Sequence, residues 1–126
     1  MANRMIQTKC APPALGAYSQ GVQVGSTLYI SGQLGLDPKS GLLLPTFLEQ
    51  AGQTFRNIQS ILEEAEFTLN DVVKFTVFMT DLSDFDALNG LMSDLFLSNC
   101  YPARSAVQVS RLPKGGLIEV DAIASR

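Results

Sequence analysis

Carboxylates, arginine, lysine, tyrosine and water must carry any chemistry in this chain, because the sequence contains no histidine. That absence excludes Ser-His and Cys-His nucleophile pairs as well as histidine metal ligands. Arg104 follows Tyr101-Pro102, where a helical pattern stops and a short strand begins. Proline fixes its own φ and favours extended geometry in the preceding residue, so this boundary holds the arginine in place. A firmly held guanidinium is well placed to bind a small anion.

Composition and charge narrow the classes of function. Cys10 and Cys100 are too few for a disulfide scaffold and lack metal-site spacing. The net charge of −3 argues against a broad phosphate-binding surface, so nucleic-acid binding is not expected. The first residues contain no apolar run of signal-peptide length, and no stretch approaches the length of a membrane span. We therefore expect a cytoplasmic protein with no membrane segment.

The hydrophobic pattern predicts one domain, residues 1–126, with two helices among several strands. Strands are expected at 5–8, 22–24, 28–33, 72–80, 103–110 and 117–124, and Gly32 inside the third suggests a bulge or a close backbone approach. Apolar residues at steps of three and four predict a helix over 47–67, with the stripe Leu48, Ala51, Phe55, Ile58, Leu62 and Ala65. A second helix is expected after Asp81, with Ser83 as its N-cap.

This order of elements predicts an α+β fold in which two helices cover one face of a mixed sheet. Strand alternation groups Arg104 with Gln108, and Glu119 with Asp121. We expect all four on the face that the helices leave open. A face that is only half polar is either solvated or shared, and we expect it to be shared with another subunit. Arg104 and Glu119 would then lie near a subunit boundary.

Several motifs in register along the chain resemble the RidA (YjgF) family of reactive-intermediate deaminases. The motifs are Gly16-Ala17-Tyr18-Ser19-Gln20-Gly21, Ser31-Gly32-Gln33, Val73-Lys74, Asp81-Leu82-Ser83-Asp84-Phe85, Asn89, Pro102-Ala103-Arg104-Ser105, Leu112-Pro113-Lys114-Gly115 and Ile118-Glu119-Val120. The resemblance runs from about residue 7 to residue 124. It implies a chorismate-mutase-like fold, a homotrimer with three clefts between subunits, and hydrolysis of enamines and imines to 2-keto acids and ammonia. It also implies no metal and no cofactor.

The resemblance also implies roles for individual residues. Arg104 would pair with the substrate carboxylate through its guanidinium fork, and Glu119 would hold or activate the attacking water as a general base. Tyr18 would form part of the cleft wall, from the adjacent subunit. Ser31 and Asn89 would be polar lining of the cleft, and backbone groups around Arg104 and Ala106 would complete it.

Other interpretations remain open for the same residues. Arg104 and Glu119 could form a structural salt bridge between subunits, and Tyr18 could be a packed ring. Ser31 and Asn89 could be ordinary hydrogen-bonding residues of a turn and a helix. Two other functions also remain. One is a regulator that binds a keto acid without turnover, and the other is an endoribonuclease or translation inhibitor.

Overall fold

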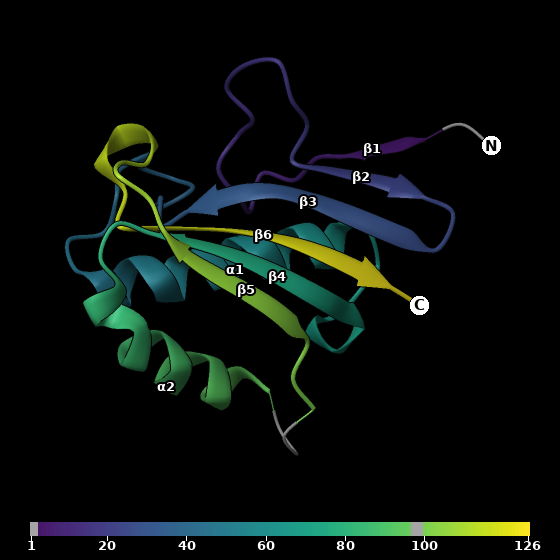
Figure 1. Ribbon diagram of the computed structural model, residues 1–126. Helices are drawn as coiled ribbons and strands as arrows, with labels where there is room; N and C mark the ends of the chain where they lie inside the picture. The colour runs from purple at the N-terminus through teal and green to yellow at the C-terminus, as the bar shows by residue number, and fades with distance from the viewer. Residues whose placement is uncertain (1–2, 97–99) are drawn as a thin grey trace.

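Residues 3–96 and 100–126 are described by the computed structural model, in which two helices lie against one sheet (Figure 1). The strands are β1 (Arg4–Ile6), β2 (Gly21–Val24), β3 (Thr27–Leu34), β4 (Val72–Met79), β5 (Ala103–Gln108) and β6 (Ile118–Ser125). The helices are α1 (Phe47–Glu64) and α2 (Phe85–Leu95), and single 3-10 turns are η1 (Leu69–Asp71), η2 (Leu82–Asp84) and η4 (Pro113–Gly115). Each predicted strand and helix is present, with ends that differ by a few residues.

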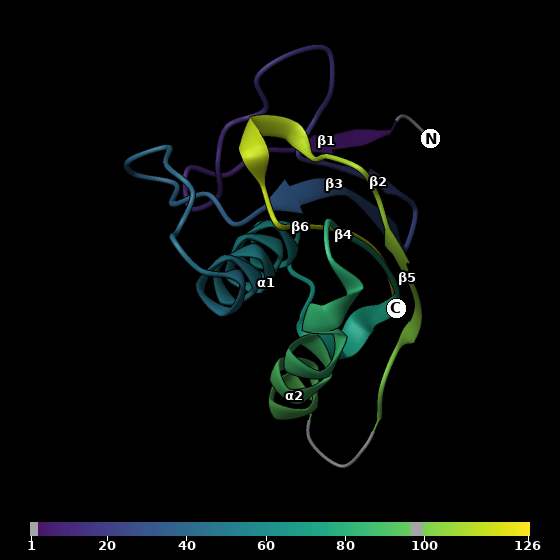
Figure 2. The ribbon, with the colours of Figure 1, turned by 60° about the vertical axis from the view of Figure 1, so that its left-hand side comes forward.

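The sheet is mixed, as the sequence predicts. Its strand order is β1-β2-β3-β6-β4-β5. β4 and β5 run parallel, and the other neighbouring strands run antiparallel. Figure 2 shows α1 and α2 on the same face of the sheet, which confirms the predicted α+β architecture. Among the helices of the described residues, none combines the length and the apolar character that crossing a membrane requires.

Capping interactions set both ends of α1. The Thr46 hydroxyl accepts from the Glu49 N–H at 3.2 Å and donates to the Glu49 carboxylate at 2.9 Å. The helix ends three residues earlier than predicted, because Glu66 adopts a left-handed φ of 63°. The Phe67 N–H then donates to the Leu62 carbonyl at 2.8 Å, a bond typical of helix C-termini.

The buried face of α1 is partly polar, which the apolar stripe does not predict. Gln50 and Asn57 are buried, whereas Leu48 is 54% exposed and lies outside the core. Gln50 accepts from the Leu117 N–H at 2.8 Å, and Asn57 donates to two main-chain oxygens at the end of β3 and just beyond it. These amides satisfy backbone groups that a leucine would leave unpaired. They fix α1 against the segments that lead into and out of the sheet.

The predicted N-cap of the second helix is wrong. Ser83 lies inside η2, and its N–H donates to the Asp81 carboxylate at 2.9 Å. This backbone hydrogen bond lowers the pKa of the Asp81 carboxyl below its ordinary value. Asp81 therefore caps η2, which continues into α2. An aspartate can cap a helix as well as serine does, and here it precedes the serine in the chain.

The two faces of the sheet do not carry the side chains that the sequence analysis assigned to them. Arg104 pairs in register with Phe75, which is fully buried on the helix-covered face, and Arg104 projects on that same side. Gln108 also turns to that side and accepts from a main-chain N–H of η2. Glu119 alternates with the buried Val120 and faces away from the helices. The expectation that Arg104 and Gln108 share the open face with Glu119 is therefore wrong.

Candidate functional site

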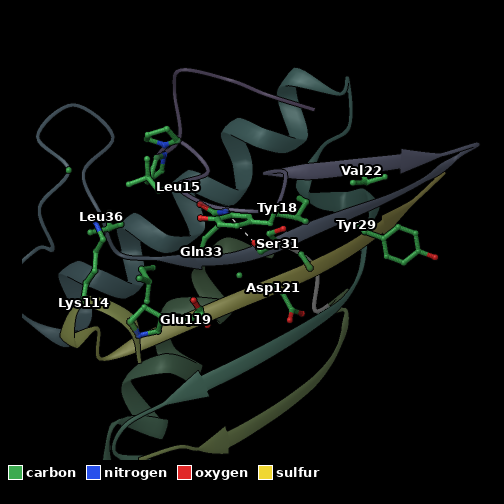
Figure 3. Close-up of a pocket in the computed structure, with 18 of the residues that line it drawn as sticks. Leu15, Tyr18, Val22, Tyr29, Ser31, Gln33, Leu36, Lys114, Glu119 and Asp121 are labelled. Carbon is green, nitrogen blue, oxygen red and sulfur yellow. Dashed lines mark hydrogen bonds between the residues drawn. The ribbon is translucent and has the colours of Figure 1, made fainter. Parts of the chain in front are cut away.

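A cavity of about 820 Å³ lies on the open face of the sheet, between the loop after β1 and the turn before β6 (Figure 3). Most of its exposed lining is apolar. Its polar and charged side chains are Tyr18, Tyr29, Ser31, Gln33, Lys114, Glu119 and Asp121. An apolar pocket that contains a few convergent polar groups is the usual form of a small-molecule site.

Glu119 enters this cavity from β6 and is partly buried. Burial raises the pKa of its carboxyl above the ordinary value, and the negative charge of Asp121 raises it further. Gly32 provides the space for the carboxylate, since a Cβ at that position would lie 2.9 Å from the Glu119 Cδ. A carboxylate with a raised pKa binds a proton more strongly, so Glu119 is better suited to act as a base than a fully solvated glutamate.

A bulge in β3 brings the strand next to the loop that carries Tyr18. The register with β6 shifts between residues 30 and 33, which confirms the bulge suggested by Gly32. The Ser31 N–H donates to the Gln20 carbonyl at 2.9 Å, and its hydroxyl donates to the Ser19 carbonyl at 2.6 Å. Because a hydroxyl has one proton, Ser31 can offer a ligand only an acceptor lone pair.

Tyr18 is 52% exposed and lines the same cavity as Ser31 and Glu119. The chain reaches it through Gly16, whose φ of 135° belongs to a region that favours glycine. A Cβ at Gly16 would lie 3.8 Å from the Tyr18 ring, in ordinary contact. Glycine is therefore favoured at position 16 by the backbone conformation and not by a lack of space for a side chain. The tyrosine has an accessible ring and hydroxyl beside the cavity.

Arg104 lies on the other face of the sheet, against α2. Its Nη1 donates to the Asn89 Oδ1 at 2.7 Å and contacts the Met92 Sδ at 3.4 Å. The guanidinium also lies 5.0 Å from the centre of the Phe85 ring, a cation–π distance. A second hollow of about 630 Å³ includes Arg104, Asn89 and Pro102 in its lining. The structure thus holds the arginine firmly, as its proline boundary predicts, but on the helix side.

Ala106 follows Arg104 on the same side of β5 and packs against the core. β5 is an edge strand, with β4 on one side only. Its outward main-chain N–H and C=O groups are therefore available to a ligand or another chain. This arrangement is compatible with the backbone role that the family resemblance implies for this segment.

The predicted site residues therefore fall into two groups within one chain. Tyr18, Ser31 and Glu119 line the open-face cavity, whereas Arg104, Asn89 and Ala106 lie on the helix-covered side. Arg104 and Glu119 cannot contact each other within the chain, because the sheet lies between them. A contact between them requires a second chain, whether as a structural salt bridge or as a shared site.

Gln33 and Lys114 line the cavity but were not proposed from the sequence. Gln33 is 5% exposed, and its amide donates to the Ser31 carbonyl at 3.2 Å. Lys114 adopts a left-handed φ of 59° in η4, a conformation that residues other than glycine seldom take. Both residues belong to motifs shared with the family, but the resemblance implies no role for either. A sequence pattern shows a turn, but it does not show which side chains the turn brings to a cavity.

A sequence model of the family described as Endoribonuclease L-PSP matches residues 8–126. The chain belongs to this family. A 2-iminobutanoate/2-iminopropanoate deaminase of Capra hircus is 49% identical over 98% of this chain and 90% of that protein. The crystal structure of RidA from the Antarctic bacterium Psychrobacter sp. PAMC 21119 is 54% identical, covers 98% of this chain and 99% of that chain, and has a TM-score of 0.94. Membership of the RidA (YjgF) family, predicted from the motifs, is confirmed.

A second solved structure is that of E. coli TdcF with bound serine. It is 40% identical to this chain, with a TM-score of 0.94, and the match covers 98% of each chain. The likeness to this structure and to the Psychrobacter RidA extends over nearly the whole fold, including both faces of the sheet.

Proposed function

We propose that this chain is a deaminase that hydrolyses reactive 2-imino acids and their enamine forms to 2-keto acids and ammonia. The observation that carries this proposal is the 49% identity, over 98% of the chain, to a protein named 2-iminobutanoate/2-iminopropanoate deaminase. The partly buried Glu119 in an open-face cavity supports it, because hydrolysis needs a base next to a bound water.

The reaction adds water to the imine carbon. Glu119 accepts a proton as the water oxygen bonds to the carbon of the protonated imine, and the C=N double bond becomes a single bond. Glu119 then returns this proton to nitrogen, which makes the amine a leaving group. As the C–N bond breaks, Glu119 accepts the proton of the hydroxyl group, so that ammonia is released and the keto group forms. A protonated imine is already electrophilic, so positioning of the water and of the substrate supplies most of the required rate gain. This chemistry needs neither a metal nor histidine.

Arg104 would bind the substrate carboxylate through two parallel hydrogen bonds. Its Nη1 is occupied by Asn89, which leaves the remaining N–H groups of the guanidinium for the ligand. Since Glu119 lies on the opposite face of the same sheet, we propose that each site combines Arg104 of one chain with Glu119 and Tyr18 of another. A homotrimer with three such clefts is the proposed assembly, and the cytoplasm the proposed compartment.

A coupled assay tests the activity directly. A dehydratase acting on serine or threonine generates the unstable imine in the cuvette, and the decay of its absorbance is followed with and without this protein. We expect faster decay with the wild type and none of this acceleration with Arg104→Ala. An unchanged decay rate with the wild type, or full acceleration by Arg104→Ala, would contradict the proposal.

Binding without turnover is the second candidate, because the related E. coli TdcF has been solved with bound serine. It predicts saturable keto-acid binding by calorimetry with no effect on imine decay. RNA cleavage is the weaker third candidate, and the family description Endoribonuclease L-PSP is what keeps it under test. Cleavage of RNA by pure wild-type protein, lost in both Arg104→Ala and Glu119→Gln, would favour it.

A further inference from the structure

Residues 7–20 join β1 to β2 and form one wall of the open-face cavity. Pro12, Pro13, Leu15 and Tyr18 of this loop line the cavity directly. A connection of this length loses much conformational entropy when it is ordered, unless specific bonds hold it. The wall that faces a ligand therefore depends on whatever fixes this loop.

The side chain of Gln20 fixes it. Gln20 is 2% exposed, and its Oε1 accepts from the Thr8 N–H at 2.7 Å. Its Nε2 donates to the carbonyls of Thr8 at 3.1 Å, Pro12 at 2.7 Å and, more weakly, Ala11 at 3.4 Å. Among residues 3–96 and 100–126, no other side chain hydrogen-bonds residues 8–12 to residues 18–20. One buried amide thus joins the two arms of the loop.

The backbone of the same residue connects the loop to the site. The Gln20 carbonyl accepts from the Ser31 N–H at 2.9 Å in the β3 bulge. Ser31 precedes Gly32, which packs against the Glu119 carboxyl group. Gln20 therefore lies where three parts of the cavity meet: the loop with the two prolines, the arm with Tyr18, and the strand beside Glu119.

We propose that Gln20 is a positioning residue for the proposed imine hydrolysis, because its side-chain amide orders the loop wall of the cavity before the substrate binds. Gln20 itself touches no reacting atom. Its contribution to catalysis rests on the proposed function, whereas its effect on loop order does not. Without the Gln20 bonds, the loop would become ordered only when the substrate binds. Part of the substrate's binding energy would then be used to order the loop, so KM would rise more than kcat would fall.

Gln20→Glu tests the proposal, with Gln7→Glu as the matched control. Glutamate keeps the acceptor for Thr8 but removes the donors to the loop carbonyls, and a buried carboxylate facing carbonyl oxygens is unfavourable. Gln7 belongs to the same loop and is exposed, so the same change there leaves these bonds intact. Native-state trypsin cleavage after Lys9 reports loop opening, and cleavage after Lys39 in a different loop serves as an internal reference.

We expect cleavage after Lys9 to accelerate about ten-fold in Gln20→Glu, with cleavage after Lys39 unchanged. We also expect KM for the imine to rise about ten-fold, with kcat changed by less than about two-fold. Gln7→Glu should match the wild type in every assay. Unchanged cleavage after Lys9, or a fall in kcat at constant KM, would overturn the proposal.

Hydrogen exchange on the wild type keeps the proposal testable if Gln20→Glu does not fold. The Thr8 amide should exchange as slowly as the amides paired between β2 and β3, because it donates to the buried Gln20 side chain. Exchange as fast as that of an open loop amide would contradict the inference. If the wild type hydrolyses no imine, the proposed function fails, and the cleavage and exchange results still decide whether Gln20 orders the loop.

Discussion

Glu119 combines partial burial with a position in the cavity, so it affects stability and activity in opposite directions. Its raised pKa means that the native state binds this proton more tightly than the unfolded state, whose carboxyl titrates near 4.5. The stabilising contribution of this group is therefore present at low pH and is lost as pH rises through the folded pKa. The base required for hydrolysis forms over the same pH range.

Glu119→Gln separates these two effects. We expect imine hydrolysis to fall by about 10²–10⁴-fold, because the general base is lost. We expect the free energy of unfolding, relative to the wild type, to increase as pH rises above the ordinary carboxyl pKa of 4.5, since the glutamine has no charge to desolvate. Rate assays and denaturant unfolding at several pH values measure both. Glu63→Gln, on the exposed surface of α1, should change neither, and a pH-independent stability difference would refute the burial argument.

Asn89 holds the guanidinium of Arg104 through the 2.7 Å bond from Nη1 to Oδ1. In Asn89→Asp a carboxylate would occupy this position and compete with the substrate carboxylate for the same positive charge. We expect KM for the imine to rise about ten-fold or more, with a smaller change in kcat. Asn70→Asp, at an exposed position in η1, is the charge-matched control. An unchanged KM in Asn89→Asp would mean that Arg104 does not bind the substrate carboxylate.

At the scale of elements, two glycines test how closely α1 and α2 approach their neighbours. A Cβ at Gly35 would lie 2.4 Å from the Gln50 Cα of α1, whereas a Cβ at Gly90 in α2 would meet nothing within 4 Å. Gly35→Ala should therefore destabilise the fold by about 1–3 kcal/mol through overpacking. Gly90→Ala should stabilise it by about 0.5–1 kcal/mol, since alanine favours a helix interior.

Denaturant unfolding of both glycine variants at one fixed protein concentration provides the measurement, because assembly would make apparent stability depend on concentration. Each variant is the control for the other, because Gly35→Ala should lower the free energy of unfolding and Gly90→Ala should raise it. A Gly35→Ala variant as stable as the wild type would show that α1 can move away from the end of β3 at little cost, despite the bonds of Gln50 and Asn57.

At the scale of the whole molecule, the position of Arg104 and Glu119 on opposite faces predicts complementation between inactive variants. Arg104→Ala and Glu119→Gln chains, unfolded together and refolded, should form mixed assemblies. If each site takes Arg104 from one chain and Glu119 from another, random mixing restores about a quarter of the wild-type sites. The imine-decay assay measures this recovery.

Each variant refolded alone is the control for the mixing experiment and should stay near its own low activity. Mixtures that are no more active than the separate variants would contradict a site shared between two chains. Light scattering of the refolded samples, at micromolar concentration, tests the proposed trimer independently. A monomer with full activity would contradict both the shared site and the assembly.

The sequence predicted the helices and strands well, because the spacing of apolar residues and the glycines and prolines that end an element are local properties of the chain. Alternation identified the strands around Phe75 and Val120, steps of three and four identified α1, and Gly32 marked the bulge. The same local rules failed for residues whose burial depends on partners that are distant in the sequence. Asn57 is buried because carbonyls at the end of β3 need donors, and no spacing along the helix indicates that need.

Local patterns were enough to predict the α+β class, the order of elements and the firm placement of Arg104 after its proline. The face on which Arg104 lies depends instead on packing between elements that are distant in the chain. A strand with period two defines two faces, but neither face of 103–108 carries a continuous stripe of large apolar side chains, so the strand's own pattern does not show which face the helices cover. Packing of Ala106 against the core and of Arg104 against Asn89 and Phe85 settles that choice. Glu119 is thereby left on the opposite face, where a site that uses both residues needs a second chain.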